Sequence, residues 1–92
     1  MLKLCGTQLP DIAIKRLIAT LLSTRDRADS RIAFRLHYAI EGGFPTLDLE
    51  ASLRERLLAV VEEADGPLAE LRGVLANDLA RRRRLTPPHT AA

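Results

Sequence analysis

Apolar residues recur every three or four positions along most of the chain, which is the spacing of a helix with one buried face. The clearest series joins Ile14, Leu17 and Leu21, and comparable series follow in the later parts of the chain. Polar and charged residues fill the positions between them. The pattern predicts four helices, over about residues 10–23, 25–41, 48–64 and 67–84.

Residues with special backbone preferences stand near most of the predicted ends. Pro10 suits a first helical turn, Gly42 and Gly43 are typical of a helix end, and Pro67 follows a glycine at the start of the fourth segment. Asp48 is the expected N-cap of the third helix. The stretch from Phe44 to Asp48 is predicted to be a turn or a short extended connector.

The boundary between the first two segments is the weakest, because neither glycine nor proline interrupts residues 11–41. One long helix is therefore an alternative. An internal likeness argues for two helices, since residues 16–22 resemble residues 56–62 and residues 31–40 resemble residues 70–79. The likeness indicates two helical hairpins of the same design, either by duplication or because leucine-rich amphipathic helices resemble one another by chance.

Length and composition favour a single all-α domain. Ninety-two residues allow one core, and the 17 leucines and 13 alanines far outnumber the eight valines and isoleucines. We therefore expect a small four-helix bundle over residues 1–85. Two pseudo-repeated helical hairpins are one way to build it. Residues 86–92, with two prolines, are expected to form a flexible tail.

Charge is distributed in blocks. Residues 1–40 carry seven Lys or Arg and three Asp (+4), residues 41–80 carry three Arg and nine Asp or Glu (−6), and residues 81–92 carry four Arg (+4). Such a chain can satisfy its charges by folding one half on the other, or by pairing head to tail with a second copy.

Groups that could support catalysis are few and scattered. Cys5 precedes the first helix, His37 lies on a helix flank, His89 is in the tail, and Glu62 and Glu63 point about 100° apart on a helix. We expect no enzyme activity, no catalytic residue, no metal site and no cofactor. No apolar run approaches the ~20 residues that span a bilayer, so we expect a cytoplasmic protein without a membrane partner.

The second predicted helix carries the candidate binding surface. Arg27, Arg31 and Arg35 recur at four-residue spacing, and Phe34 and Tyr38 flank them. Arginine and aromatic residues are enriched at the centres of protein interfaces. We expect a non-catalytic protein-interaction or regulatory module in which the cations steer and the rings anchor a protein partner or a second copy in a homodimer.

Nucleic-acid binding through the same helix is the alternative. The first two helices would form a helix-turn-helix, and the basic run Arg81, Arg82, Arg83 and Arg84 would serve as a phosphate tether. Asp26 and Asp29 on the same helix, and a turn without glycine, weaken this interpretation. The arginine run is better explained as a helix end, where cations favour the negative end of the helix dipole and Asp78 can pair with Arg82.

Overall fold

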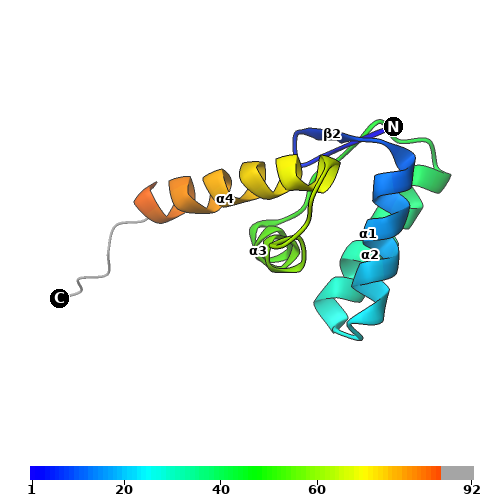
Figure 1. The fold of residues 1–92 in the computed structure, drawn as a ribbon, viewed down its shortest axis with the longest axis horizontal. Helices are drawn as coiled ribbons and strands as arrows, with labels where there is room; N and C mark the ends of the chain where they lie inside the picture. Colours follow the sequence, from blue (N-terminus) through cyan, green and yellow to red (C-terminus); the bar gives the residue numbers. More distant parts are fainter. Residues whose placement is uncertain (86–92) are drawn as a thin grey trace.

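A small β-sheet accompanies the helices in the computed structural model, which describes residues 1–85 (Figure 1). The elements in chain order are β1 (Leu2–Leu4), β2 (Thr7–Leu9), α1 (Asp11–Ser23), α2 (Arg27–Glu41), β3 (Thr46–Leu47), α3 (Ala51–Val60) and α4 (Pro67–Leu85). The prediction of four helices is close to the observed bounds, but the prediction of an all-α bundle is wrong. The fold is a small α+β fold with a mixed three-stranded sheet.

The first nine residues form a hairpin that the sequence analysis did not predict. Strands β1 and β2 pair antiparallel, and the connection consists of Cys5 (φ 49°) and Gly6 (φ 87°). Positive φ at both positions is the geometry of a two-residue type I′ turn, whose twist matches that of the strands. Leu2, Leu4 and Leu9 alternate with polar residues and are fully buried, so the hairpin closes one side of the core.

Strand β3 adds to the other edge of β1, in parallel orientation. The amide of Lys3 donates to the carbonyl oxygen of Pro45, and the amide of Cys5 donates to that of Leu47, both at 2.9 Å. The connector predicted after the second helix is therefore extended, and its hydrogen bonds make β1 the central strand. This pairing joins the start of the chain to the segment between α2 and α3.

The first two helices are separate, so the alternative of one long helix is wrong. Arg25 adopts a positive φ of 58°, and Asp26 then caps α2 by accepting from the amides of Ala28 (2.8 Å) and Asp29 (3.2 Å). The side-chain cap supplies the start signal that glycine or proline would otherwise give. Helices α1 and α2 lie side by side and antiparallel in Figure 1, and they share the largest helix–helix contact of the fold.

The second pair of helices does not repeat the first. Helix α3 begins after Glu50 rather than at Asp48, because the preceding residues remain extended beside β1, and it ends at Val60 instead of continuing to residue 64. In Figure 1, α3 is seen almost along its axis whereas α4 lies in the plane of the view, so the two helices cross steeply. The prediction of two equivalent hairpins is wrong.

The core lies between the sheet and the four helices. Its largest fully buried side chains are Leu2, Leu4, Leu9, Ile14, Leu17, Leu21, Ile32, Leu36, Leu57, Val61, Leu71 and Leu75. Helix α4 extends beyond this core, which makes the molecule elongated, about 48 Å long and 25 Å across. The predicted flexible tail, residues 86–92, lies outside the described residues.

Candidate protein-binding surface

Helix α2 turns one face to the core and presents the opposite face to solvent. Ile32 and Leu36 are fully buried, whereas Phe34 and Tyr38 are each 72% exposed. At 100° per residue, the exposed rings lie within about 60° of Arg27 and Arg31 around the helix axis. The burial pattern that fixes the inner face of α2 therefore also places two large rings in solvent.

A third ring joins them from the segment that follows α2. Gly43 has a positive φ of 71°, and the chain reverses so that the amide of Phe44 donates to the carbonyl oxygen of Ala39 at 2.9 Å. The rings of Phe44 and Tyr38 stack with centroids 6.0 Å apart and planes 18° from parallel. Gly42 makes this arrangement possible, because a Cβ at that position would lie 2.6 Å from Cε2 of Phe44.

The three rings border a groove of about 530 Å³, which we call the aromatic groove. Its lining residues are Phe34, Arg35, Tyr38, Ala39, Phe44, Thr46 and Leu47. The groove lies along β3, an edge strand of the sheet. Phe34 also borders a second apolar groove of about 240 Å³, lined by Ile18, Leu22, Ala33 and His37. Phe34 thus stands between two apolar depressions of the surface.

The cations predicted to accompany the rings have different surroundings. Arg35 lines the aromatic groove and forms an ion pair with Glu50, the residue before α3. A hydrogen bond to its own backbone and the guanidinium of Arg35 hold the pKa of the Glu50 carboxyl below its usual range, and the charge of Arg31 adds to this effect. Arg27 and Arg31 are exposed and do not line the groove.

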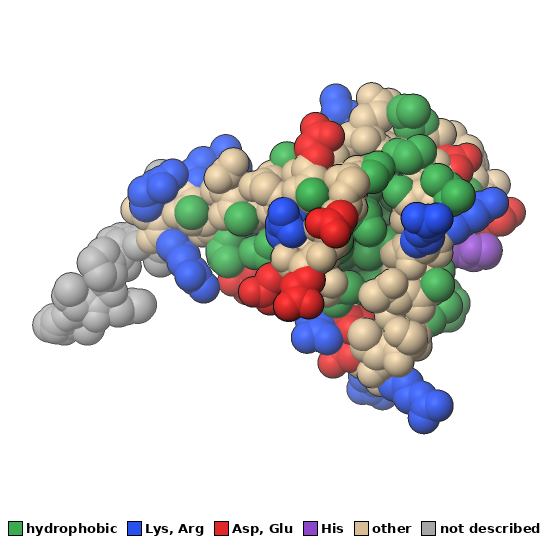
Figure 2. Space-filling view, viewed as in Figure 1, with side chains coloured by type: hydrophobic (Ala, Val, Ile, Leu, Met, Phe, Trp, Pro, Cys, Tyr) green, Lys and Arg blue, Asp and Glu red, His purple; other side chains and the backbone are tan. Residues whose placement is uncertain are grey.

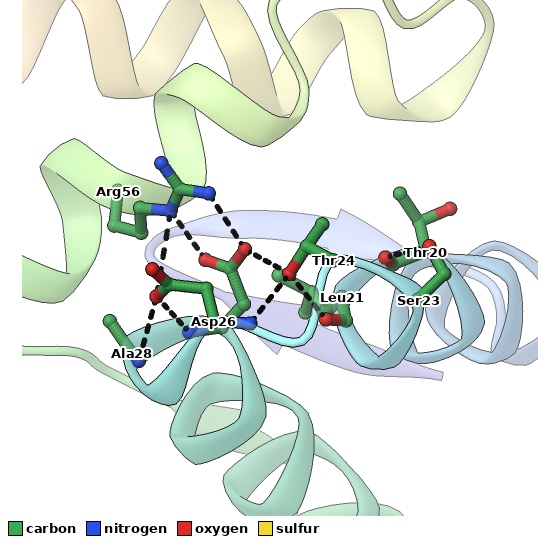
Figure 3. Close-up of polar contacts among 8 residues, drawn as sticks. Thr20, Leu21, Ser23, Thr24, Asp26, Ala28 and Arg56 are labelled. Carbon is green, nitrogen blue, oxygen red and sulfur yellow. Dashed lines mark hydrogen bonds and ion pairs between the residues drawn. The ribbon is translucent and has the colours of Figure 1, made fainter.

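Asp29, a weakness of the nucleic-acid interpretation, is neutralised inside the molecule. Its side chain is fully buried and accepts from Nε and Nη2 of Arg56 on α3, at 2.6 and 2.8 Å (Figure 3). The hydroxyl of Thr24 lies beside the same carboxylate, and Asp26 lies 4.0 Å from Nε of Arg56. The bonds from Arg56 outweigh burial and hold the pKa of the Asp29 carboxyl below its usual range, with Thr24 contributing. These hydrogen bonds and ion pairs hold the α1–α2 turn against α3.

The arginine run continues α4 rather than forming a separate segment. Asp78 accepts from Arg81 and Arg82 at 3.0 Å each and lies 3.7 Å from Arg54 on α3. The predicted pairing of Asp78 with Arg82 is therefore confirmed. Burial alone would raise the pKa of Asp78, but the bonds from Arg82 and Arg81 and the charge of Arg54 bring it below its usual range.

Two arginines of the run remain outside this network. Arg83 and Arg84 are exposed, and Arg84 borders a groove of about 500 Å³ that also contains Cys5, Arg54 and Arg81. Burial raises the pKa of the Cys5 thiol, which lowers the fraction of reactive thiolate at neutral pH. The run lies at the far end of α4, away from α2 in Figure 1.

Among the five predicted contact residues, Phe34, Arg35 and Tyr38 meet at the aromatic groove. Arg27 and Arg31 lie on the same exposed helix face, next to the rings. Phe44, which the sequence analysis assigned to the connector after α2, also belongs to the groove. The two glycines that precede it signal a chain reversal toward the helix just completed, which is the feature that could have placed it.

Searches for a matching protein-family model, a similar characterised protein and a similar solved structure each found no match. None of the helices within residues 1–85 combines the length and apolar character that crossing a bilayer requires. In the same part of the chain, no group of three His, Cys, Asp or Glu side chains is placed to hold a metal ion.

Proposed function

We propose that the protein is a non-catalytic protein-interaction module, and that the aromatic groove takes up an amphipathic helix bordered by carboxylates. The observation that carries the proposal is the exposure of three neighbouring rings, Phe34 and Tyr38 at 72% and Phe44 at 51%. Most exposed apolar residues on monomeric proteins are isolated, whereas a contiguous apolar patch commonly marks an interaction site.

The charges around the groove favour an acidic partner. Arg27 and Arg31 extend from the exposed face of α2, and Asp29, the carboxylate in its first turn, is buried against Arg56. The positive charge next to the rings is therefore not cancelled by Asp29. Carboxylates on a partner helix would be steered toward this face, while the rings would supply the apolar contact.

Nucleic-acid binding remains the second candidate, because the same two arginines could contact phosphate. The side-by-side arrangement of α1 and α2 in Figure 1 differs from the steep crossing of a helix-turn-helix. The arginine run at the far end of α4 is also remote from α2, so the two would not both contact one short duplex, as the tether interpretation expects.

We further propose a cytoplasmic location, where a free thiol such as Cys5 is normally kept reduced.

Tyr38 gives a direct test, because it is the only tyrosine and the chain has no tryptophan. A synthetic helical peptide with leucine and alanine on one face, bordered by glutamate and free of aromatic residues, is titrated while Tyr38 emission is recorded. We expect a saturable change in Tyr38 emission. Phe34→Ala should weaken the affinity for the peptide about 30-fold, the effect typical of a truncated aromatic anchor. Ile12→Ala, at another exposed apolar residue (61% exposed), should bind as the wild type does.

Two comparisons separate protein from nucleic acid as the partner. The same peptide with lysine in place of glutamate should bind more weakly. A labelled nonspecific DNA duplex should bind weakly or not at all. Duplex binding that falls steeply with salt and survives Phe34→Ala, together with no response to the acidic peptide, would overturn the proposal in favour of the nucleic-acid function.

A further inference from the structure

Another surface groove lies between α3 and α4, and its chemistry is opposite to that of the aromatic groove. Its floor consists of small and apolar residues, Leu58, Ala59, Gly73 and Ala76, and its volume is about 480 Å³. Two carboxylates, Glu55 and Glu62, border it. We call it the acidic groove. In Figure 2, acidic side chains gather near the middle of the molecule, where Figure 1 places α3.

The floor of the acidic groove has room for a bulky side chain. A Cβ built on Gly73 meets no atom within 4 Å, so the surface is open at this point of α4. The one cation in the lining, Arg72, is folded back and donates to the carbonyl oxygens of Glu62 (3.1 Å) and Ala64 (2.9 Å). A ring that entered the groove would meet small side chains below it and carboxylates at its ends.

The groups on the two surfaces follow one another in a similar order. On α2, Arg31 and Tyr38 are seven residues apart with Phe34 between them, which places them about 10 Å apart along the helix. Glu55 on α3 and Glu62, which lies in the turn just after α3, are also seven residues apart in the sequence, and Leu58 and Ala59 lie between them. A cation, a ring and a hydroxyl on one surface thus correspond to a carboxylate, an apolar floor and a carboxylate on the other.

We propose that the partner of the aromatic groove is a second copy of this chain, which docks through the α3 face that carries its acidic groove. The proposal rests on the proposed function and names the partner of the same surface. Phe34 would enter over Ala59 and Gly73, with Arg31 next to one bordering carboxylate and the hydroxyl of Tyr38 next to the other. The opposite charges of the two surfaces and the similar order of their groups favour a copy of the chain as the partner.

The two helices would pack antiparallel. In that direction Arg31 lies opposite Glu62, and Arg27, one turn earlier, lies near the acidic turn that contains Glu63 and Asp65. The reverse direction would bring Glu41, at the end of α2, against this same turn and would cause repulsion. In the antiparallel arrangement, the dipoles of the two helices also point in opposite directions.

Each copy carries both surfaces, and this determines the experiment. Two copies can form the contact twice, in a closed pair. If the substitution Arg31→Glu is present in every copy, both contacts set carboxylate against carboxylate. With Glu62→Arg in every copy, both contacts set cation against cation. In a mixture of the two variants, one contact is wild type and the other has its charges exchanged, so both are restored.

The mass in solution and Tyr38 emission are measured as protein concentration increases. For the wild type we expect the mass to rise from 10.2 kDa toward twice that value, with a parallel change in emission. Each single variant should associate at least about tenfold more weakly, and the equimolar mixture should recover wild-type association. Arg31 and Glu62 are exposed and form no hydrogen bond or ion pair through their side chains within residues 1–85, so both variants should fold. Far-UV circular dichroism checks this.

The outcomes separate this proposal from the one it rests on. A wild-type chain that stays at 10.2 kDa, while the acidic peptide still changes Tyr38 emission, refutes the second copy and leaves the protein-binding function in place. Association that Arg31→Glu weakens but Glu62→Arg does not would also refute the acidic groove as the partner. If neither the peptide nor a second copy affects Tyr38, both proposals fail together.

Discussion

Replacing Asp29 by asparagine tests whether the buried ion pair with Arg56 holds the α1–α2 turn against α3. Asp29 is fully buried and accepts two hydrogen bonds from the guanidinium of Arg56, at 2.6 and 2.8 Å. Asparagine has nearly the same shape, but it loses the charge and turns an NH2 group toward a donor. At one of the two positions, the NH2 group of asparagine then faces an N–H donor of Arg56. The other hydrogen bond is kept, but its acceptor is no longer charged.

The expected loss of stability follows from these contacts. A hydrogen bond to a charged group contributes about 1.5–3 kcal/mol, and an unsatisfied buried group adds to the cost. Arg56 is 40% exposed on its side chain and can recover part of its hydration, which reduces the loss. We expect Asp29→Asn to lower the free energy of unfolding by about 2–4 kcal/mol. In a domain of this size, this change lowers the Tm by roughly 10–25 °C.

Urea unfolding followed by far-UV circular dichroism measures this loss, since the chain has no tryptophan to report by fluorescence. The pH dependence gives a second check. Because the pKa of Asp29 is lower in the folded chain than its ordinary value of about 3.9, its contribution is complete above that value and disappears as the pH falls further. The difference in the free energy of unfolding between the wild type and Asp29→Asn should be constant above about pH 5 and should decrease below about pH 4.

Arg56→Met provides the contrasting variant, because it leaves the carboxylate of Asp29 buried without its cation. Without that cation, burial would raise the pKa of Asp29. As the pH falls and Asp29 takes up a proton, the stability of this variant should therefore approach that of the wild type. At neutral pH it should be less stable than Asp29→Asn. A loss below about 0.5 kcal/mol for Asp29→Asn, the range of an ordinary surface substitution, would falsify the reasoning.

Three further substitutions, one of them with a matched control, test other parts of the structure. Gly42→Ala should displace the ring of Phe44, since the new Cβ would lie 2.6 Å from it, and should change Tyr38 emission without unfolding the chain. Leu4→Ala should lower the free energy of unfolding by about 2–5 kcal/mol in urea, whereas Leu22→Ala, at an exposed position, should lower it by less than about 1 kcal/mol. Thr7→Val should raise the Tm by a few degrees, because the buried hydroxyl of Thr7 has no hydrogen-bond partner within residues 1–85.

The helices could be predicted because their signals are local. The spacing of Ile32 and Leu36 identifies the inner face of α2, and Gly42 marks its end, so both features need only neighbouring residues. The hairpin also carried a local signal, since Leu2, Leu4, Thr7 and Leu9 alternate on either side of a two-residue link that ends in glycine. That signal is weak because each strand has only three residues, fewer than the runs of about four to eight by which strands are identified.

The parallel pairing of β3 with β1 could not be predicted in the same way. It joins residues about 43 positions apart, Lys3 with Thr46 and Leu4 with Leu47, and a two-residue strand has no periodicity of its own. For the candidate site, exposure of Phe34 and Tyr38 follows from the helix period. The contact of Tyr38 with Phe44 depends on the chain reversal at Gly43, and the neutralisation of Asp29 depends on a residue of α3. Both need the folded chain.

The central position of β1 also governs the order in which the chain can fold. A ribosome releases β1 before α1 and α2, yet Leu47, the partner of Leu4 in β3, follows more than forty residues later. An isolated hairpin of this length is at best marginally stable in water. Strand β1 therefore stays unpaired on one edge until α1 and α2 have been made. Synthesis pauses in this interval would prolong the exposure of that edge, which is the kind of surface where chains aggregate.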